Sequence, residues 1–199
     1  MKKKTRKINN TGYQFLRPLC KLFLIIIGLP KTVNKELVPK EDGFIFAGTH
    51  VSYMDPFLVG NTTPRSVHFL AKIELTQNKL LKPFMSLFGV IPVDRKLSKN
   101  PEAKQAAVEA LKDGNIICVF PEGTRNRTDK PLMPFKFGAV SFAYKSGKPI
   151  VPFAITPKPK AFRRKQIIIG EPFYVKSADL EKENKKLEKI VLELLEKGK

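Results

Sequence analysis

The chain has 199 residues, of which 42% are hydrophobic and 28% charged, so it is long enough to bury one sizeable core and lacks the composition of a disordered protein. Its 37 basic residues outnumber the 18 acidic ones and leave a net charge of +19, which indicates an anionic partner such as nucleic acid, anionic lipid headgroups or a phosphorylated substrate. Cys20 and Cys118 are far apart in apolar surroundings, and no Cys or His cluster has metal-ligand spacing, which argues against a disulfide framework and a zinc site and favours a reducing, cytoplasmic setting.

The N-terminal part of the chain combines a basic start with an apolar segment. Arg17, Pro18 and Lys21 interrupt the apolar residues, and the longest uncharged run is shorter than the roughly 18 to 20 residues of a membrane span. Pro18 is predicted to start a helix that Gly28 ends. We assign residues 1–40 to a basic and apolar membrane-docking segment, with a helix that lies at the membrane interface; the alternative is a first helix packed on the domain core.

From Gly43 onward, short apolar runs alternate with helical patterns, which is typical of a single α/β domain with a mixed, largely parallel central sheet flanked by helices. We assign this domain to residues 41–199. Leucines at helical spacing predict a C-terminal amphipathic helix over about 178–197 that packs on the core, with partner binding as the alternative. Strands are predicted at 44–48, 67–71, 90–93, 116–120, 150–155 and 167–169, and the remaining helices at 56–60, 75–88, 101–113 and 137–145.

His50 and Asp55 form the pair with the clearest chemical use. On one regular helix, five residues turn through about 500°, so the two side chains would point about 140° apart and can meet only across a turn. The strand predicted at 44–48 and the helix start at Asp55-Pro56 supply that turn. Asp55 can then accept a hydrogen bond from one ring nitrogen of His50 and leave the other to take a proton from a substrate hydroxyl. Taken alone, the spacing also fits an ordinary loop histidine beside an N-capping aspartate.

A second motif, Pro121-Glu122-Gly123-Thr124-Arg125, follows the predicted strand 116–120. Its proline ends the strand, its glycine lets the main chain approach a ligand closely, its threonine can donate a hydrogen bond, and its arginine has a planar fork that matches phosphate oxygens. Strand ends of α/β sheets are the usual place for ligands, so the loop is a candidate phosphate site. A turn with a surface arginine is the alternative.

Four motifs follow one another along the chain: His50-x4-Asp55, then Lys72-Ile73-Glu74-Leu75 with Gly89 and Arg95, then Phe120 to Arg125, then Ile150-Val151-Pro152-Phe153. Their order and spacing resemble those of the motifs in the glycerolipid acyltransferases, and most of all in the bacterial 1-acyl-sn-glycerol-3-phosphate acyltransferases. Residues 134–139 and 169–173 add to the similarity, which covers roughly residues 43–175, and the basic, apolar leader looks like the membrane-docking helices of that family.

The resemblance implies that His50 is the general base and Asp55 its orienting partner when an acyl group moves from a thioester to a glycerol hydroxyl. It implies that Val151 and Pro152 lie on the acyl-donor side. Lys72 and Arg95 are alternatively solvated surface charges, and Glu122 alternatively braces its loop. Thr49 stands where many relatives have Asn, which leaves the hydrogen bond made at that position open. The implied phosphate-binding set is Arg95, Glu122, Gly123, Thr124, Arg125 and Lys72.

The expected function is transfer of a fatty acyl group from acyl carrier protein or coenzyme A to the sn-2 hydroxyl of 1-acyl-sn-glycerol-3-phosphate (lysophosphatidic acid), which gives phosphatidic acid. We expect no cofactor and no metal, because the thioester is already activated, and a location on the cytoplasmic face of the cell membrane, peripheral or monotopic. An alternative acceptor is glycerol-3-phosphate or another lysophospholipid. A non-enzymatic basic protein that binds nucleic acid or a membrane is the alternative of another class; no nucleic-acid partner is expected, because no recognised binding motif is present.

Overall fold

The computed structural model of the protein describes residues 11–26, 31–72, 90–93, 101–156 and 166–198. The predicted helix 75–88 and Arg95 lie outside the described residues. Within this part of the chain, seven strands form one sheet in the order β1-β7-β6-β2-β5-β3-β4. The strands are β1 (Lys31–Val33), β2 (Phe44–Gly48), β3 (Val67–Lys72), β4 (Ile91–Val93), β5 (Ile116–Val119), β6 (Ile150–Ile155) and β7 (Gln166–Ile169).

The sheet is mixed and largely parallel, as the sequence predicts. β2 is parallel to both of its neighbours, β5 and β6, and the pairs β3–β5, β3–β4 and β1–β7 are parallel too. The pairing of β6 with β7 is antiparallel, so β7 and β1 run against the other five strands. Strands β2 and β6 have the predicted bounds, and β3, β4, β5 and β7 each differ from the prediction by one residue at one end.

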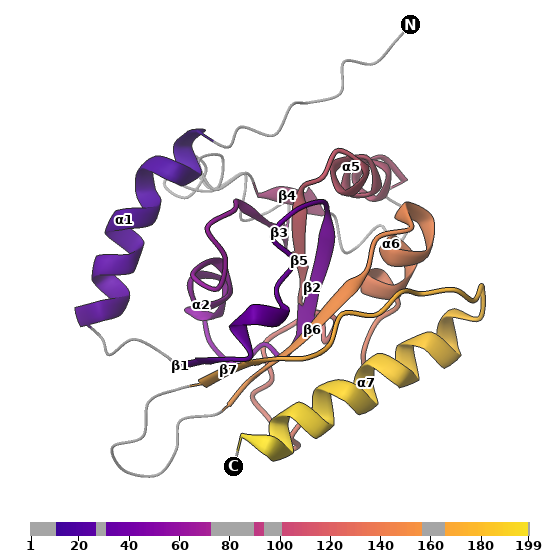
Figure 1. Cartoon of the computed structure of the whole chain (residues 1–199). Helices are drawn as coiled ribbons and strands as arrows, with labels where there is room; N and C mark the ends of the chain where they lie inside the picture. Colours follow the sequence, from indigo (N-terminus) through magenta and orange to yellow (C-terminus); the bar gives the residue numbers. More distant parts are fainter. Residues whose placement is uncertain (1–10, 27–30, 73–89, 94–100, 157–165, 199) are drawn as a thin grey trace, which may run out of the picture.

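Helices cover both faces of the sheet (Figure 1). On one face, α5 (Pro101–Lys112), α6 (Gly138–Ser146) and α7 (Leu180–Lys197) pack on the side chains of Ile45 and Ala47. On the other, α1 (Thr11–Ile26), the short 3-10 helix η1 (Lys35–Leu37) and α2 (Asp55–Gly60) pack on Phe44 and Phe46. Because alternate residues of β2 enter opposite cores and all are buried, this central strand is an apolar run, as parallel strands covered on both faces usually are.

The C-terminal end of β2 lies close against β6. A Cβ on Gly48 would overlap the carbonyl oxygen of Phe153, so only glycine permits the two main chains to approach this closely. Beyond it, the buried hydroxyl oxygen of Thr49 accepts a hydrogen bond from the N–H of Ile155 at 2.8 Å and lies 3.5 Å from the Ile155 carbonyl oxygen, to which it donates. Thr49 thus extends the contact of β2 with β6, and its hydrogen bonds are directed to β6 rather than to the His50 ring.

The helix α1 begins at Thr11, so the prediction that Pro18 starts it is wrong; Pro18 lies inside. An interior proline costs about 3 kcal/mol, because it removes one helical hydrogen bond and crowds the preceding turn. Contacts with the domain offset this cost before Pro18: Arg17 donates to the carbonyl of Thr63 at 3.0 Å, and Gln14 donates to that of Pro64 at 3.4 Å. Tertiary contacts therefore allow the helix to begin at Thr11, upstream of Pro18, although proline locally favours a helix start.

One side of α1 packs on the domain and another side is exposed. Leu24 is buried in the same core as Val38, as the packed-helix alternative expects. Leu19, Leu22 and Ile25 are 63%, 54% and 49% exposed. The strand β1 joins the sheet through β7, so the sheet extends into the range 1–40 that the sequence assigns to membrane docking. Among the helices of the described residues, none has the length and apolar character needed to cross a bilayer.

The C-terminal helix α7 packs on the core, as predicted. Asp179 caps its first turn by accepting a hydrogen bond from the N–H of Lys182 at 3.0 Å. Its apolar stripe includes Leu187 and Val191, which lie in the core with α5 and α6, and Leu194 and Leu195, which cover β6 and β7. The helix is therefore an integral layer of the domain (Figure 1).

Candidate active site

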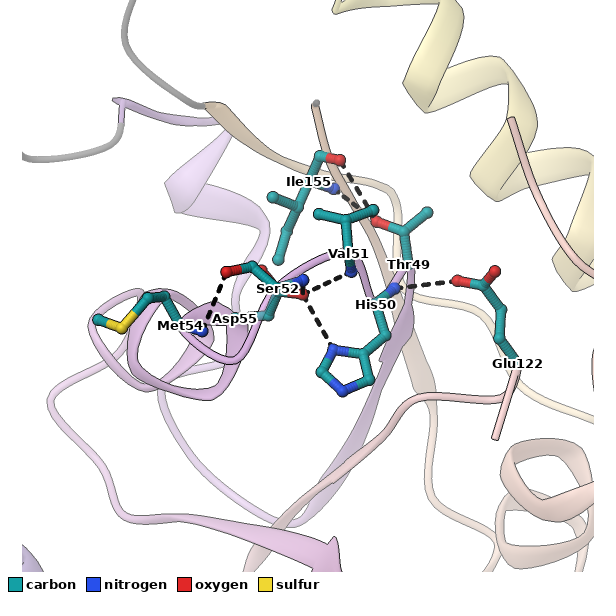
Figure 2. Close-up of polar contacts among 8 residues, drawn as sticks. All are labelled: Thr49, His50, Val51, Ser52, Met54, Asp55, Glu122 and Ile155. Carbon is teal, nitrogen blue, oxygen red and sulfur yellow. Dashed lines mark hydrogen bonds and ion pairs between the residues drawn. The ribbon is translucent and has the colours of Figure 1, made fainter. Parts of the chain in front are cut away.

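The two motifs that are predicted to carry the chemistry meet at one edge of the sheet. His50 follows β2 and Glu122 follows β5, and these strands are parallel neighbours whose carboxyl ends lie at the same edge. The N–H of His50 donates to Glu122 Oε1 at 2.9 Å across 72 residues of sequence. Figure 2 shows Asp55 and Glu122 on opposite sides of His50.

The His50 ring is fixed at its edge by Asp55. The distance from His50 Nδ1 to Asp55 Oδ2 is 2.9 Å, which confirms the hydrogen bond predicted across the turn. The same oxygen accepts the N–H groups of Val51 at 2.6 Å and Ser52 at 2.7 Å, and Asp55 is fully buried as the first residue of α2. With an acceptor on Nδ1, the neutral ring carries its proton there and has Nε2 as its basic nitrogen. The pair therefore has the arrangement that general-base chemistry requires.

The face of the His50 ring lies on Phe120. The two ring centroids are 4.1 Å apart with an interplanar angle of 18°, and Phe120 in turn packs edge-on against Phe153 of β6 at 6.1 Å. This apolar contact restrains the ring in a direction that the Asp55 hydrogen bond leaves free. The His50 side chain is 19% exposed, so a small part of the ring remains open to solvent or substrate.

The main chain of His50 is held by the loop after β5. Besides the bond from its N–H to Glu122, its carbonyl accepts the N–H of Asn126 at 2.7 Å. Glu122 is 4% exposed, and its other oxygen accepts the N–H of Met133 at 3.1 Å. Burial raises the pKa of Glu122, and the hydrogen bonds from His50 and Met133 act in the opposite direction. These contacts are the ones expected if Glu122 braces its loop. Direct contact of Glu122 with the substrate stays an untested prediction.

Arg125 and Gly123 connect this loop with two other segments. The guanidinium carbon of Arg125 is 3.3 Å from the centroid of the Tyr53 ring, which belongs to the turn between His50 and Asp55. Gly123 has φ +74°, a backbone conformation that favours glycine, and a Cβ there would lie 2.8 Å from Nζ of Lys136, so that flexible side chain would have to shift. Thr124 is exposed between them. Cationic groups therefore border the loop on two sides.

For three residues at the site, no role was predicted from the sequence. Phe120 stacks on His50, Tyr53 lies under Arg125, and Lys136 covers Gly123 while its N–H donates to the carbonyl of Pro121 at 2.8 Å. Lys136 lies in the stretch 134–139 that contributes to the family resemblance, and this resemblance is the sequence signal that could have pointed to a role at the site. The stacking of Phe120 on His50 and of Arg125 on Tyr53 depends on which strand ends are neighbours, so no local sequence pattern predicts it.

The remaining predicted site residues lie elsewhere. Lys72 is the last residue of β3, but its side chain, like Arg95, is outside the described residues. Val151 and Pro152 are buried within β6, where they pair with Phe46 and Ala47 of β2, and the structure does not bring them next to His50. Their packing between strands and helices is a sufficient reason for apolar residues there. Their assignment to the acyl-donor side stays a prediction.

Comparisons with known proteins agree on one family. Residues 30–156 match the sequence model of the acyltransferase family. The chain is 35% identical over 168 residues to the 1-acyl-sn-glycerol-3-phosphate acyltransferase of Bacillus subtilis, covering 81% of this chain and 82% of that protein. It is 30% identical over 146 residues to the Borreliella burgdorferi protein of the same name, covering 72% of this chain and 58% of that one. The crystal structure of the 1-acyl-sn-glycerophosphate (LPA) acyltransferase PlsC from Thermotoga maritima has the same fold, with a TM-score of 0.73, 24% identity and coverage of 92% and 78%.

Proposed function

The chain belongs to the acyltransferase family, and we propose that it transfers a fatty acyl group from an acyl thioester to the sn-2 hydroxyl of 1-acyl-sn-glycerol-3-phosphate, giving phosphatidic acid. The names of its relatives in Bacillus subtilis and Borreliella burgdorferi support this acceptor. The observation that carries the mechanism is the 2.9 Å contact between His50 Nδ1 and Asp55 Oδ2, because it leaves Nε2 as the basic nitrogen of a ring that is otherwise fixed.

In the proposed mechanism, Nε2 of His50 takes the proton of the acceptor hydroxyl while the hydroxyl oxygen attacks the thioester carbonyl. The new C–O ester bond forms, the C–S bond breaks, and the proton on Nε2 passes to the departing sulfur. Asp55 stabilises the imidazolium that exists between these proton transfers. Because a hydroxyl is a weak nucleophile at neutral pH, such assistance is worth about 10² to 10⁴-fold in rate.

The phosphate of the acceptor is proposed to bind at the loop after β5. A phosphate monoester carries about −1.5 to −2 charges at pH 7, which a planar guanidinium and a second cation match. Arg125 stacks on Tyr53, in the same turn as His50, so a phosphate held by Arg125 keeps the rest of the acceptor near the base. Thr124 and the main chain at Gly123 add hydrogen-bond donors, and Lys72 and Arg95 are proposed as further cations.

The acyl donor is proposed to be acyl carrier protein or coenzyme A, both of which carry the acyl group as a thioester. A thioester needs no further activation, so the proposed reaction uses no cofactor beyond this co-substrate. Val151 and Pro152 are proposed for the acyl-donor side on the basis of the family resemblance alone.

The protein is proposed to act at the cytoplasmic face of the cell membrane as a peripheral or monotopic protein. Leu19, Leu22 and Ile25 supply exposed apolar surface on α1, and the basic residues at 2–7 suit anionic headgroups. The substitution of all three apolar residues by Ser tests this without removing Leu24, which the core needs. Binding to vesicles that contain phosphatidylglycerol is expected to fall; unchanged binding contradicts the assignment.

The acceptor and donor are tested together with purified full-length protein. Acyl coenzyme A and acyl carrier protein are each combined with lysophosphatidic acid, glycerol-3-phosphate or lysophosphatidylcholine, beside a His50→Ala control. We expect phosphatidic acid from lysophosphatidic acid and no product above background from the variant. Transfer to glycerol-3-phosphate alone changes the acceptor to the alternative one. No transfer to any acceptor, or equal rates for the variant, contradicts the proposal.

A further inference from the structure

The carboxylate of Glu122 is occupied on both oxygens by main-chain groups from two different loops. Oε1 accepts the N–H of His50 at 2.9 Å, and Oε2 accepts the N–H of Met133 at 3.1 Å. With 4% of the residue exposed, there is little surface left for a substrate. An ionised carboxylate would also repel the acceptor phosphate, so these contacts favour a role toward the protein rather than toward the ligand.

The segment that supplies Met133 is itself held by the C-terminal helix. The N–H of Phe135 donates to Glu188 Oε1 at 2.7 Å, and its carbonyl accepts Nδ2 of Asn184 at 2.8 Å. Both Glu188 and Asn184 belong to α7, which lies beyond the residues 30–156 matched by the family model. A continuous series of hydrogen bonds and short main-chain links therefore runs from α7 through Phe135, Met133 and Glu122 to the peptide of His50.

His50 has three anchors, and each restrains a different part of it. Asp55 holds the ring edge, Phe120 supports the ring face, and Glu122 holds the main-chain N–H. A shift of the main chain would carry the ring with it and would strain or break the hydrogen bond to Asp55. Since a displacement of about 1 Å at a reacting group can cost about 10²-fold in rate, the main-chain anchor matters for proton transfer.

We propose that Glu122 is a positioning residue that fixes the main chain of His50, and that Glu188 and Asn184 of α7 support it through the 133–135 segment. The inference rests on the proposed function for its kinetic consequences. It assigns to the third motif's glutamate a task different from phosphate binding, and to the C-terminal helix a part in the active site.

The first test is Glu122→Gln, which keeps the size of the side chain but replaces one acceptor oxygen by an NH₂ group that faces a main-chain N–H. At least one of the two hydrogen bonds is lost. We expect kcat to fall about ten- to hundredfold while KM for lysophosphatidic acid stays within about twofold. A rise in KM with kcat unchanged overturns the proposal, because it is the result expected of a residue that binds the acceptor.

The second test uses α7 and has a matched control. Glu188→Gln and Glu183→Gln change two glutamates of the same helix that each accept a main-chain N–H, but Glu183 binds Ser177, away from the 133–135 segment. We expect Glu188→Gln to lower kcat about two- to tenfold and Glu183→Gln to leave it unchanged. Equal effects of the two substitutions overturn the role of α7.

A third readout does not depend on activity. In full-length protein, hydrogen exchange of the His50 and Met133 amides is expected to become at least about tenfold faster in Glu122→Gln, while the amide of Phe46 in the middle of β2 keeps its wild-type rate. Unchanged exchange at His50 and Met133 overturns the positioning role. Wild-type protein that transfers no acyl group contradicts the proposed function instead, and the exchange measurement then decides the positioning role alone.

Discussion

The imidazole of His50 and the guanidinium of Arg125 lie on adjoining loops but are held in very different ways. His50 is fixed at its ring edge, ring face and main chain by Asp55, Phe120 and Glu122. Arg125 lies over the ring of Tyr53, a residue that is itself 73% exposed. Proton transfer requires the reacting atoms within a narrow range of distance, whereas a cation attracts a phosphate over a wider range of positions. Rigid support is therefore concentrated at the proposed base, whereas the proposed phosphate-binding loop depends on charge.

The largest effect is expected at the rigidly held His50, from the substitution Asp55→Asn. The amide oxygen can still accept a hydrogen bond from His50, but it lacks the charge that stabilises an imidazolium. We expect kcat to fall about 10²-fold or more, with KM for lysophosphatidic acid little changed. Initial rates, together with a melting curve that shows the variant to be folded, provide the measurement. A kcat within threefold of the wild type would remove the distinction between the two regions.

At the charged rim, Arg125→Ala is expected to act mainly on KM. Loss of a charge-assisted contact worth about 1.5 to 3 kcal/mol raises KM for lysophosphatidic acid about ten- to hundredfold, while kcat changes much less. Arg127→Ala is the matched control, because Arg127 is an exposed arginine two residues further along the same loop. The comparison fails if Arg125→Ala lowers kcat and leaves KM unchanged, or if both variants behave alike.

A smaller effect is expected from Lys136→Met. Methionine keeps an apolar stem over Gly123 but removes the ammonium that lies beside it. We expect KM for lysophosphatidic acid to rise about two- to fivefold at low salt and the difference to shrink at high salt, as for an exposed charge. Lys130→Met, at an exposed position of the same connection, serves as control. A salt-independent loss of kcat would instead place Lys136 with the rigid support of His50.

The smallest effect concerns the pH dependence of stability. Burial raises the pKa of Glu122 in the folded protein above its value in the unfolded chain, so the unfolded state loses its proton first as the pH rises. The stability contributed by the protonated carboxyl is therefore present below the unfolded-state pKa and lost as the pH rises through the folded-state pKa. The deficit of Glu122→Gln relative to wild type is expected to be largest near pH 4 and smaller at pH 7. Urea unfolding of both proteins at these pH values measures it, and a deficit that grows with pH contradicts the raised pKa.

Local sequence signals were sufficient for most of the strands and for the His50–Asp55 turn. β2 and β6 are continuous apolar runs with turn residues beside them, so their bounds follow from hydrophobicity and from the neighbouring turn residues. His50 and Asp55 are only five residues apart, and the strand end before one and Pro56 after the other leave little choice of geometry. The three-residue β1 was not predicted, because Lys31-Thr32-Val33 is not an apolar run of the kind that marks the other strands.

Tertiary structure alone decided how the two motifs meet and where α1 begins. The contact between His50 and Glu122 spans 72 residues and exists because β2 and β5 are neighbours, an order that no local pattern encodes. Pro18 favours a helix start locally, yet contacts from Arg17 and Gln14 to the domain extend α1 beyond it. The chemical groups of the site were thus determined by residue type and short spacing, whereas their support was determined by strand order, because packing free energy outweighs local preference when the two differ.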